Sequence, residues 1–85
     1  MGERLVLKDG TTIDGASAAL TGGYLWLWIP GWTMRQAADV MFDQDRTGKI
    51  WYMNGEETIN EFTGYTNCVT LMTEDGQISV CMTKG

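Results

Sequence analysis

The sequence has no histidine, a single proline, two cysteines and only six basic residues against eleven acidic ones. Without histidine, the chain alone cannot form an imidazole zinc site, a Ser-His-Asp triad or a Cys-His dyad. Phosphate-binding motifs are missing as well, since Gly22-Gly23 fits neither the Walker pattern nor GxGxxG. The sequence therefore predicts a protein that is not an enzyme and that uses no cofactor.

The shortage of basic residues restricts the partners that the chain can bind. With a net charge of −5, it has no basic face that could displace the counterions of a phosphate backbone. Direct nucleic-acid binding is therefore not expected. An acidic surface can instead complement a basic protein partner.

Long hydrophobic runs are absent too. The longest, Tyr24–Ile29, is far shorter than the ~20 residues that span a bilayer, and MGERLVLKDG at the N-terminus lacks the apolar segment of a secretory signal. We expect a cytoplasmic protein without a membrane partner, in which Cys68 and Cys81 stay reduced as two small apolar residues. At 85 residues, the chain predicts a single domain over 1–85, with a thin core that oligomerisation would help to cover.

Most of the chain has the pattern of β-strands separated by glycine turns. LVLKDGTTI predicts a hairpin with a three-residue loop ending at Gly10, because this loop pairs Leu5 with Ile13 and gathers the apolar residues on one face. The small residues of GASAALTGG are predicted to link this hairpin to a strand over YLWLWI, which Pro30-Gly31 ends.

Two further hairpins are predicted in the C-terminal half, in IWYMNGEETI and in NCVTLMTEDGQISVCM. Each contains a residue pair typical of two-residue loops, Asn54-Gly55 and Asp75-Gly76. The pairs expected from these loops are Ile50 with Ile59, Val69 with Met82, and Leu71 with Val80.

One helix is predicted over about 33–43. Thr33 and Gln36 fit a capping box, and an apolar stripe follows at Met34, Ala37, Ala38 and Met41. The order of elements predicts an α+β fold, in which one helix packs against a mostly antiparallel β-sheet or partly open barrel of about six to seven strands.

The segment after this helix, DQDRTGKI, resembles the start of an EF-hand calcium loop. Asp43, Asp45 and Thr47 take the first three ligand positions, and Gly48 takes the turn position. Asn54, however, stands where the loop needs a glutamate, and a predicted hairpin replaces the second helix. The favoured interpretation is a polar loop with Gly48 at positive φ, and a weak calcium site at these three residues is an alternative.

Three of the four tryptophans lie in Gly22–Trp32, GGYLWLWIPGW. In a strand, alternate residues point to opposite sides, so neither side of this segment is polar. One side can be part of a two-sided core, a homo-oligomer interface, or a site for a partner or a small nucleotide. The candidate binding residues are Tyr24, Trp26, Trp28, Trp32, Arg35 and Trp51, with Arg35 placed to hold a phosphate.

Three segments give the chain a wider resemblance: LVLKDGTTIDGASAALTG, TMRQAADVMFDQDRT and FTGYTNCVTLMTEDGQISVCM. On these segments the chain is similar to small uncharacterised proteins encoded by phages and prophages of gut-type bacteria. The resemblance implies a role in host takeover or in virion assembly.

Together, these observations predict a non-enzymatic, phage-type binding protein that occupies or sequesters a host component. An inhibitor of bacterial defence, either anti-CRISPR-like or signal-sequestering, fits this description. The alternatives are a minor virion or assembly protein that self-associates, and a weak EF-hand-like calcium-binding module.

Overall fold

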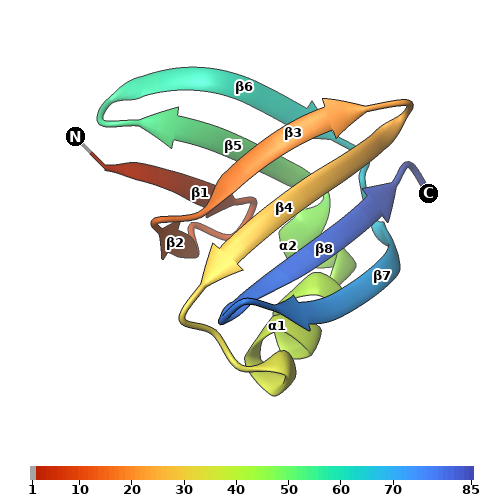
Figure 1. Cartoon of the computed structure of the whole chain (residues 1–85). Helices are drawn as coiled ribbons and strands as arrows, with labels where there is room; N and C mark the ends of the chain where they lie inside the picture. Colours follow the sequence, from red (N-terminus) through yellow and green to blue (C-terminus); the bar gives the residue numbers. More distant parts are fainter. Residues whose placement is uncertain (1) are drawn as a thin grey trace.

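Tight turns fold the chain into four antiparallel hairpins, which combine into two four-stranded sheets (Figure 1). The computed structural model describes residues 2–85. One sheet has the order β2-β1-β5-β6, with strands β1 Glu3–Leu7, β2 Thr12–Asp14, β5 Lys49–Asn54 and β6 Glu57–Thr63. The other has the order β3-β4-β8-β7, with strands β3 Ser17–Thr21, β4 Tyr24–Pro30, β7 Asn67–Glu74 and β8 Gln77–Thr83.

The predicted α+β class is confirmed, with eight strands in two sheets rather than six to seven in one. The sheets do not close into a barrel. Their inner faces and the main helix, α1 Met34–Met41, enclose one core. Figure 1 shows α1 behind β7 and β8, on the inner side of their sheet. The core residues are Leu5, Leu7, Ile13, Ala16, Leu25, Leu27, Ile29, Ala37, Val40, Met41, Ile50, Phe62, Tyr65, Ile78, Val80 and Met82.

The first hairpin has the predicted register. Leu5 pairs with Ile13, and the Leu7 amide donates to the Thr11 carbonyl over 2.8 Å. Gly10 closes the three-residue loop at a φ of 92°, a conformation that side chains other than glycine rarely adopt. This register places Leu5, Leu7 and Ile13 in the core together.

The predicted link GASAALTGG is a strand for part of its length, which corrects the sequence interpretation. Ser17–Thr21 forms β3 and pairs with β4 without interruption, from Ser17 with Trp28 to Thr21 with Tyr24. The turn between them is Gly22-Gly23, and both residues have positive φ, as the tight turns of hairpins require. Small residues gave no hydrophobic alternation from which β3 could be predicted.

The register predicted for the β5–β6 hairpin is wrong. Asn54 pairs with Glu57, so the two-residue loop is Gly55-Glu56, and a bulge then shifts the register beyond Met53. Ile50 pairs with Phe62 instead of Ile59, which is left exposed. The observed pairing buries the larger apolar side chain, Phe62, and burial rather than turn preference sets the register.

The β7–β8 hairpin agrees with the prediction near its turn and departs from it further along. Leu71 pairs with Val80, and the loop is Asp75-Gly76 at positive φ, as expected. A bulge at Val69 then places Cys68 opposite Met82, so the predicted pairing of Val69 with Met82 is wrong. Both cysteines are free thiols.

The helix begins at the predicted place. The Thr33 hydroxyl accepts the Gln36 amide over 3.2 Å, and the Gln36 side chain accepts the Thr33 amide over 2.9 Å, which completes the capping box. The buried stripe is Ala37, Val40 and Met41. Met34 was predicted to lie in this stripe, but its side chain is exposed.

Candidate functional site

Strand β4 has two sides of different character. Leu25, Leu27 and Ile29 are fully buried in the core. Trp26 and Trp28 are half-buried and Tyr24 is 46% exposed, all on the outer side. The alternation predicted for this strand is confirmed, and its aromatic side chains form a ridge on the outside of the β3-β4-β8-β7 sheet.

The strands beside β4 present small residues on this outer side. The pairing places Ala19 and Cys81 on either side of Trp26, and Ser17 and Ser79 on either side of Trp28. Strand β7 continues these rows with Thr70 and Met72. We call this surface the aromatic face, and it consists of Ser17, Ala19, Thr21, Tyr24, Trp26, Trp28, Thr70, Met72, Ser79, Cys81 and Thr83.

The tryptophans shield the small residues next to them. Ser79 is 4% exposed and Cys81 3% exposed, although both lie on the outer side of a sheet that no other element covers in Figure 1. Burial raises the pKa of the Cys81 thiol above its ordinary value, which keeps it protonated at neutral pH. The ridge therefore packs against the small residues of its own sheet.

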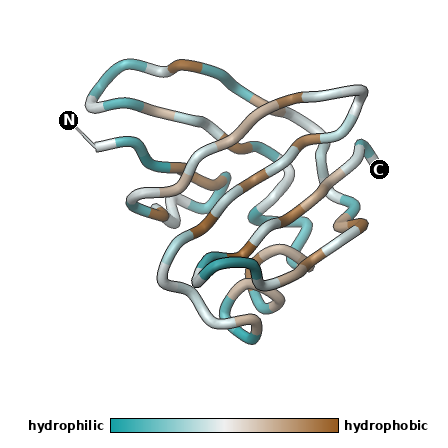
Figure 2. The backbone as a smooth tube through the Cα atoms, viewed as in Figure 1, coloured by the Kyte–Doolittle hydropathy of each residue, from teal (hydrophilic) through white to brown (hydrophobic). Residues whose placement is uncertain are grey.

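The aromatic face contains no charged residue. Within β3, β4, β7 and β8, all of which the structure describes, Glu74 is the only charged side chain; it lies on the same outer side, at the corner beside the β7–β8 turn. Figure 2 shows the same contrast: the backbone of β3 and β4 is neutral to hydrophobic, whereas the β7–β8 turn is strongly hydrophilic. The solvated outer face of an antiparallel sheet usually carries polar residues, which alternate along each strand with the apolar residues of the inner face.

The outer side of the other sheet has the ordinary, charged composition. Arg4 pairs with Asp14 across β1 and β2, and the Lys49 ammonium lies 2.7 Å from the Glu61 carboxylate. The two sheets therefore differ sharply on their outer sides, and the β3-β4-β8-β7 sheet carries only Glu74 there as a charged residue.

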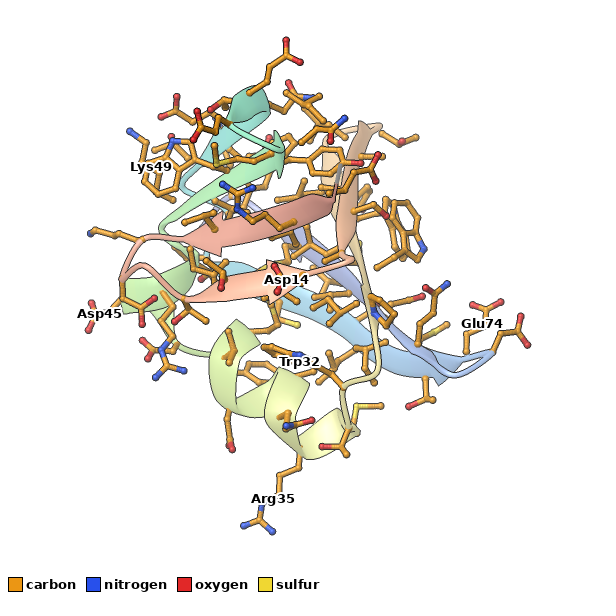
Figure 3. All side chains as sticks on the ribbon, turned by 90° about the vertical axis from the view of Figure 1, so that its left-hand side faces the viewer. Asp14, Trp32, Arg35, Asp45, Lys49 and Glu74 are labelled. Atoms are coloured by element: carbon orange, nitrogen blue, oxygen red, sulfur yellow. The ribbon has the colours of Figure 1, made fainter. Side chains whose placement is uncertain are left out.

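Trp51 does not lie on the aromatic face. It pairs with Val6 and Glu61 on the outer side of the β2-β1-β5-β6 sheet, and the Lys49 ammonium lies 5.5 Å from its ring centroid. Lys49 and Glu74 mark the two outer sides, and Figure 3 shows them on opposite sides of the molecule. The structure therefore separates Trp51 from Tyr24, Trp26 and Trp28.

Trp32 and Arg35 also lie apart from the ridge. Trp32 follows β4 and packs half-buried against the core beside α1. Arg35 is exposed on the first turn of α1, and Figure 3 shows its side chain projecting away from the body of the protein. Of the six candidate residues, only Tyr24, Trp26 and Trp28 are brought together.

Two residues that the sequence interpretation did not select extend this surface. Met72 lies on the aromatic face at 42% exposure, and Val69, at the bulge of the same strand, is 53% exposed. The alternation of NCVTLMTE in the sequence indicates that Met72 lies on the outer side of β7. The bulge at Val69 has no signature in the sequence.

The segment that resembles a calcium loop folds instead as a short helix, α2 Gln44–Thr47. The Asp43 carboxylate caps this helix by accepting the Asp45 amide over 3.0 Å, and it also pairs with Arg46. Gly48 has a φ of −59°, so the predicted positive φ is wrong. No cluster of three metal-binding side chains occurs among residues 2–85.

Comparison with protein-family models, with curated proteins and with solved structures finds no match to this chain. In the part of the chain that the structure describes, no helix has the length and hydrophobicity needed to cross a membrane. No pocket is found among these residues either.

Proposed function

We propose that this protein is a non-enzymatic binding protein that covers part of a partner protein with its aromatic face. The observation that carries the proposal is that this outer sheet face carries a single charged residue, Glu74 at its corner, beside a second outer face that is charged. The centres of protein interfaces are depleted of charge and enriched in tryptophan, tyrosine and methionine. Trp26, Trp28, Tyr24 and Met72 supply these residue types on one surface.

A protein partner fits this face better than a nucleic acid does. Single-stranded nucleic acids bind to aromatic rings that are combined with cationic side chains for the phosphates. The strands of the aromatic face offer no cation, and Arg35 points away from it. The net charge of −5 around an uncharged centre favours a partner that is apolar at its centre and basic at its rim.

The resemblance to small phage and prophage proteins supports a role for this binding in host takeover or in virion assembly. In this proposal the protein is phage-encoded and occupies a surface of a host component in the bacterial cytoplasm. Inhibition of a bacterial defence protein is the role that we propose, and a self-associating virion component is the alternative.

The test compares matched lysine substitutions on the two outer faces. Trp28→Lys places a charge in the centre of the aromatic face, and Trp51→Lys places the same charge on the opposite sheet. Each purified variant is immobilised, a lysate of the host bacterium is passed over it, and the retained proteins are quantified. We expect a host protein that the wild type and Trp51→Lys retain equally and that Trp28→Lys loses by at least about tenfold.

Circular dichroism and thermal melts establish that both variants are folded before the comparison. The proposal is wrong if no protein is retained specifically by the wild type, or if Trp28→Lys and Trp51→Lys retain the same proteins in the same amounts. A dimer that Trp28→Lys abolishes would show that the aromatic face binds a second copy. This result would favour the alternative of a self-associating virion component.

A further inference from the structure

The two sheets have four edge strands, and three of them carry features that block pairing with another chain. Natural proteins protect edges by keeping them short, by bulging them, or by placing charges on them. Strand β2 has three residues and ends in Asp14. Strand β6 contains a bulge and Glu61, and β7 contains a bulge at Val69 and ends in Glu74.

Strand β3 has none of these protections. Its five residues, Ser17–Thr21, include no charge and no proline, and they pair with β4 without a register shift. Leu20 is 53% exposed on this edge, which adds an apolar side chain to the open backbone. Figure 1 shows β3 at the margin of its sheet, where β4 is the only strand that pairs with it.

The turn determines which backbone groups β3 presents outward. Thr21 and Tyr24 close the two-residue loop, so this pair is the hydrogen-bonded kind, as are the alternate pairs at Ala19 and Ser17. The amides and carbonyls of Ala18 and Leu20 therefore point away from β4. Among the described residues, no backbone group outside the sheet bonds to them.

We propose that this edge is a self-association site, where β3 of a second copy pairs antiparallel with β3 about a twofold axis at Ala19. In this register Ala18 of each copy forms the hydrogen-bonded pair with Leu20 of the other, which uses all four outward groups on each strand. The large Leu20 side chain meets the small Ala18, and Ser17 meets Thr21. The pairing is self-complementary, as a twofold interface must be.

The absence of charge at the β3 edge allows a second copy to be the occupant. Each chain has a net charge of −5, so two copies repel each other over most of their surfaces. Strand β3 and its neighbour β4 carry no charged residue, so no like charges meet at the seam. A five-residue seam buries well below the ~1,200 Å² of a standard interface, so we expect a weak dimer that forms at tens of micromolar or above.

The dimer would have one continuous eight-stranded sheet, with two aromatic faces side by side on its outer side. The pairing uses the backbone of β3 and the side chain of Leu20, and does not occupy the aromatic face. It is therefore independent of the proposed function, and either can fail without the other.

The test uses two β3 variants and two controls. Leu20→Lys charges the edge, and Ala18→Pro removes an outward amide that β4 does not use. Ile59→Lys makes the same kind of change on an exposed side chain of the β6 edge, and Trp28→Lys changes the aromatic face. The mass of each protein is measured by sedimentation equilibrium from about 5 to 500 µM, a range that brackets a weak dimer.

For the wild type, Ile59→Lys and Trp28→Lys, we expect the average mass to rise with concentration from 9.5 kDa toward twice that value. Leu20→Lys and Ala18→Pro should associate at least about tenfold more weakly. Amide exchange at Ala18 and Leu20 should slow with concentration in the wild type. The proposal is overturned by a wild type that remains monomeric throughout, by a dimer that survives both β3 variants, or by a dimer that Trp28→Lys abolishes.

Discussion

At the scale of single residues, position on the sheet decides what a side chain contributes. Leu27 and Leu20 lie on neighbouring strands and on the same side of their sheet, yet Leu27 is fully buried and Leu20 is 53% exposed. The sequence cannot distinguish them, because both are leucines in apolar segments. They differ because Leu27 belongs to the core cluster, whereas Leu20 lies on the edge strand outside it.

This contrast gives a matched pair of stability predictions. Leu27→Ala should lower the free energy of unfolding by about 2–5 kcal/mol, because it removes buried methyl groups and leaves a cavity in the core. Leu20→Ala should cost less than about 1 kcal/mol. Both changes in the free energy of unfolding are measured by urea unfolding below about 5 µM protein, where a weak dimer is dissociated. Equal costs would contradict the burial difference.

Asp9 should make stability depend on pH at the acid end. Its carboxylate accepts the Thr11 amide over 2.9 Å and lies 3.0 Å from Arg46, and chiefly the Thr11 hydrogen bonds, then Arg46, lower its pKa from 3.8. A carboxylate with a lowered pKa stabilises the fold above its unfolded pKa, and this contribution is lost as the pH falls through the folded pKa.

The matched variant is Asp9→Asn, which keeps the shape of the side chain and removes the charge. The wild type should be the more stable of the two at pH 6, and the difference should shrink as the pH is lowered below about 3.8. Urea midpoints at several pH values measure this. A difference that stays constant down to pH 2 would show that the charge of Asp9 is not involved.

At the scale of elements, the sequence was informative where local chemistry and burial agreed. The first hairpin was predicted correctly, because Gly10 and the apolar pair Leu5–Ile13 favour the same register. In the β5–β6 hairpin the turn signal at Asn54-Gly55 and the burial of Phe62 disagree, and burial determines the register. Strand β3 was missed because its small residues are placed by β4 rather than by a pattern of their own.

The start of α1 is the most local of these features and can be tested by itself. Thr33→Ala removes the hydroxyl that accepts the Gln36 amide, and should lower the free energy of unfolding by about 1 kcal/mol. Gln36→Ala removes the reciprocal bond to the Thr33 amide. The double variant should cost less than the sum of the single costs, because the two bonds position each other. Full additivity would contradict a coupled capping box.

At the scale of the whole molecule, the candidate site depends on the order of strands in the sheets. Alternation in YLWLWIP predicted that Tyr24, Trp26 and Trp28 share a side, and the structure confirms it. The sequence could not show that Trp51 lies on the opposite sheet, because β5 pairs with β1, which is more than forty residues away. The aromatic face, with Glu74 at its corner as the only charge, also arises only when β3, β7 and β8 come together around β4.

The grouping of the hairpins into two sheets explains how one small protein presents two different surfaces. Hairpins β1–β2 and β5–β6 form the sheet with the charged outer side, and hairpins β3–β4 and β7–β8 form the sheet with the aromatic face. The core joins the inner faces of the two sheets and helix α1. The outer sides are therefore free to differ, and substitutions on one should leave the other unaffected.

The most direct test of the proposed binding face is the dissociation constant of a retained host protein, measured by calorimetry for Trp28→Lys and for Trp51→Lys. A charge in the centre of an interface should weaken binding by about 30-fold or more, which corresponds to at least 2 kcal/mol. The same charge on the opposite sheet should change the constant by less than about threefold. Equal dissociation constants for the two variants would contradict the assignment of the aromatic face as the binding surface.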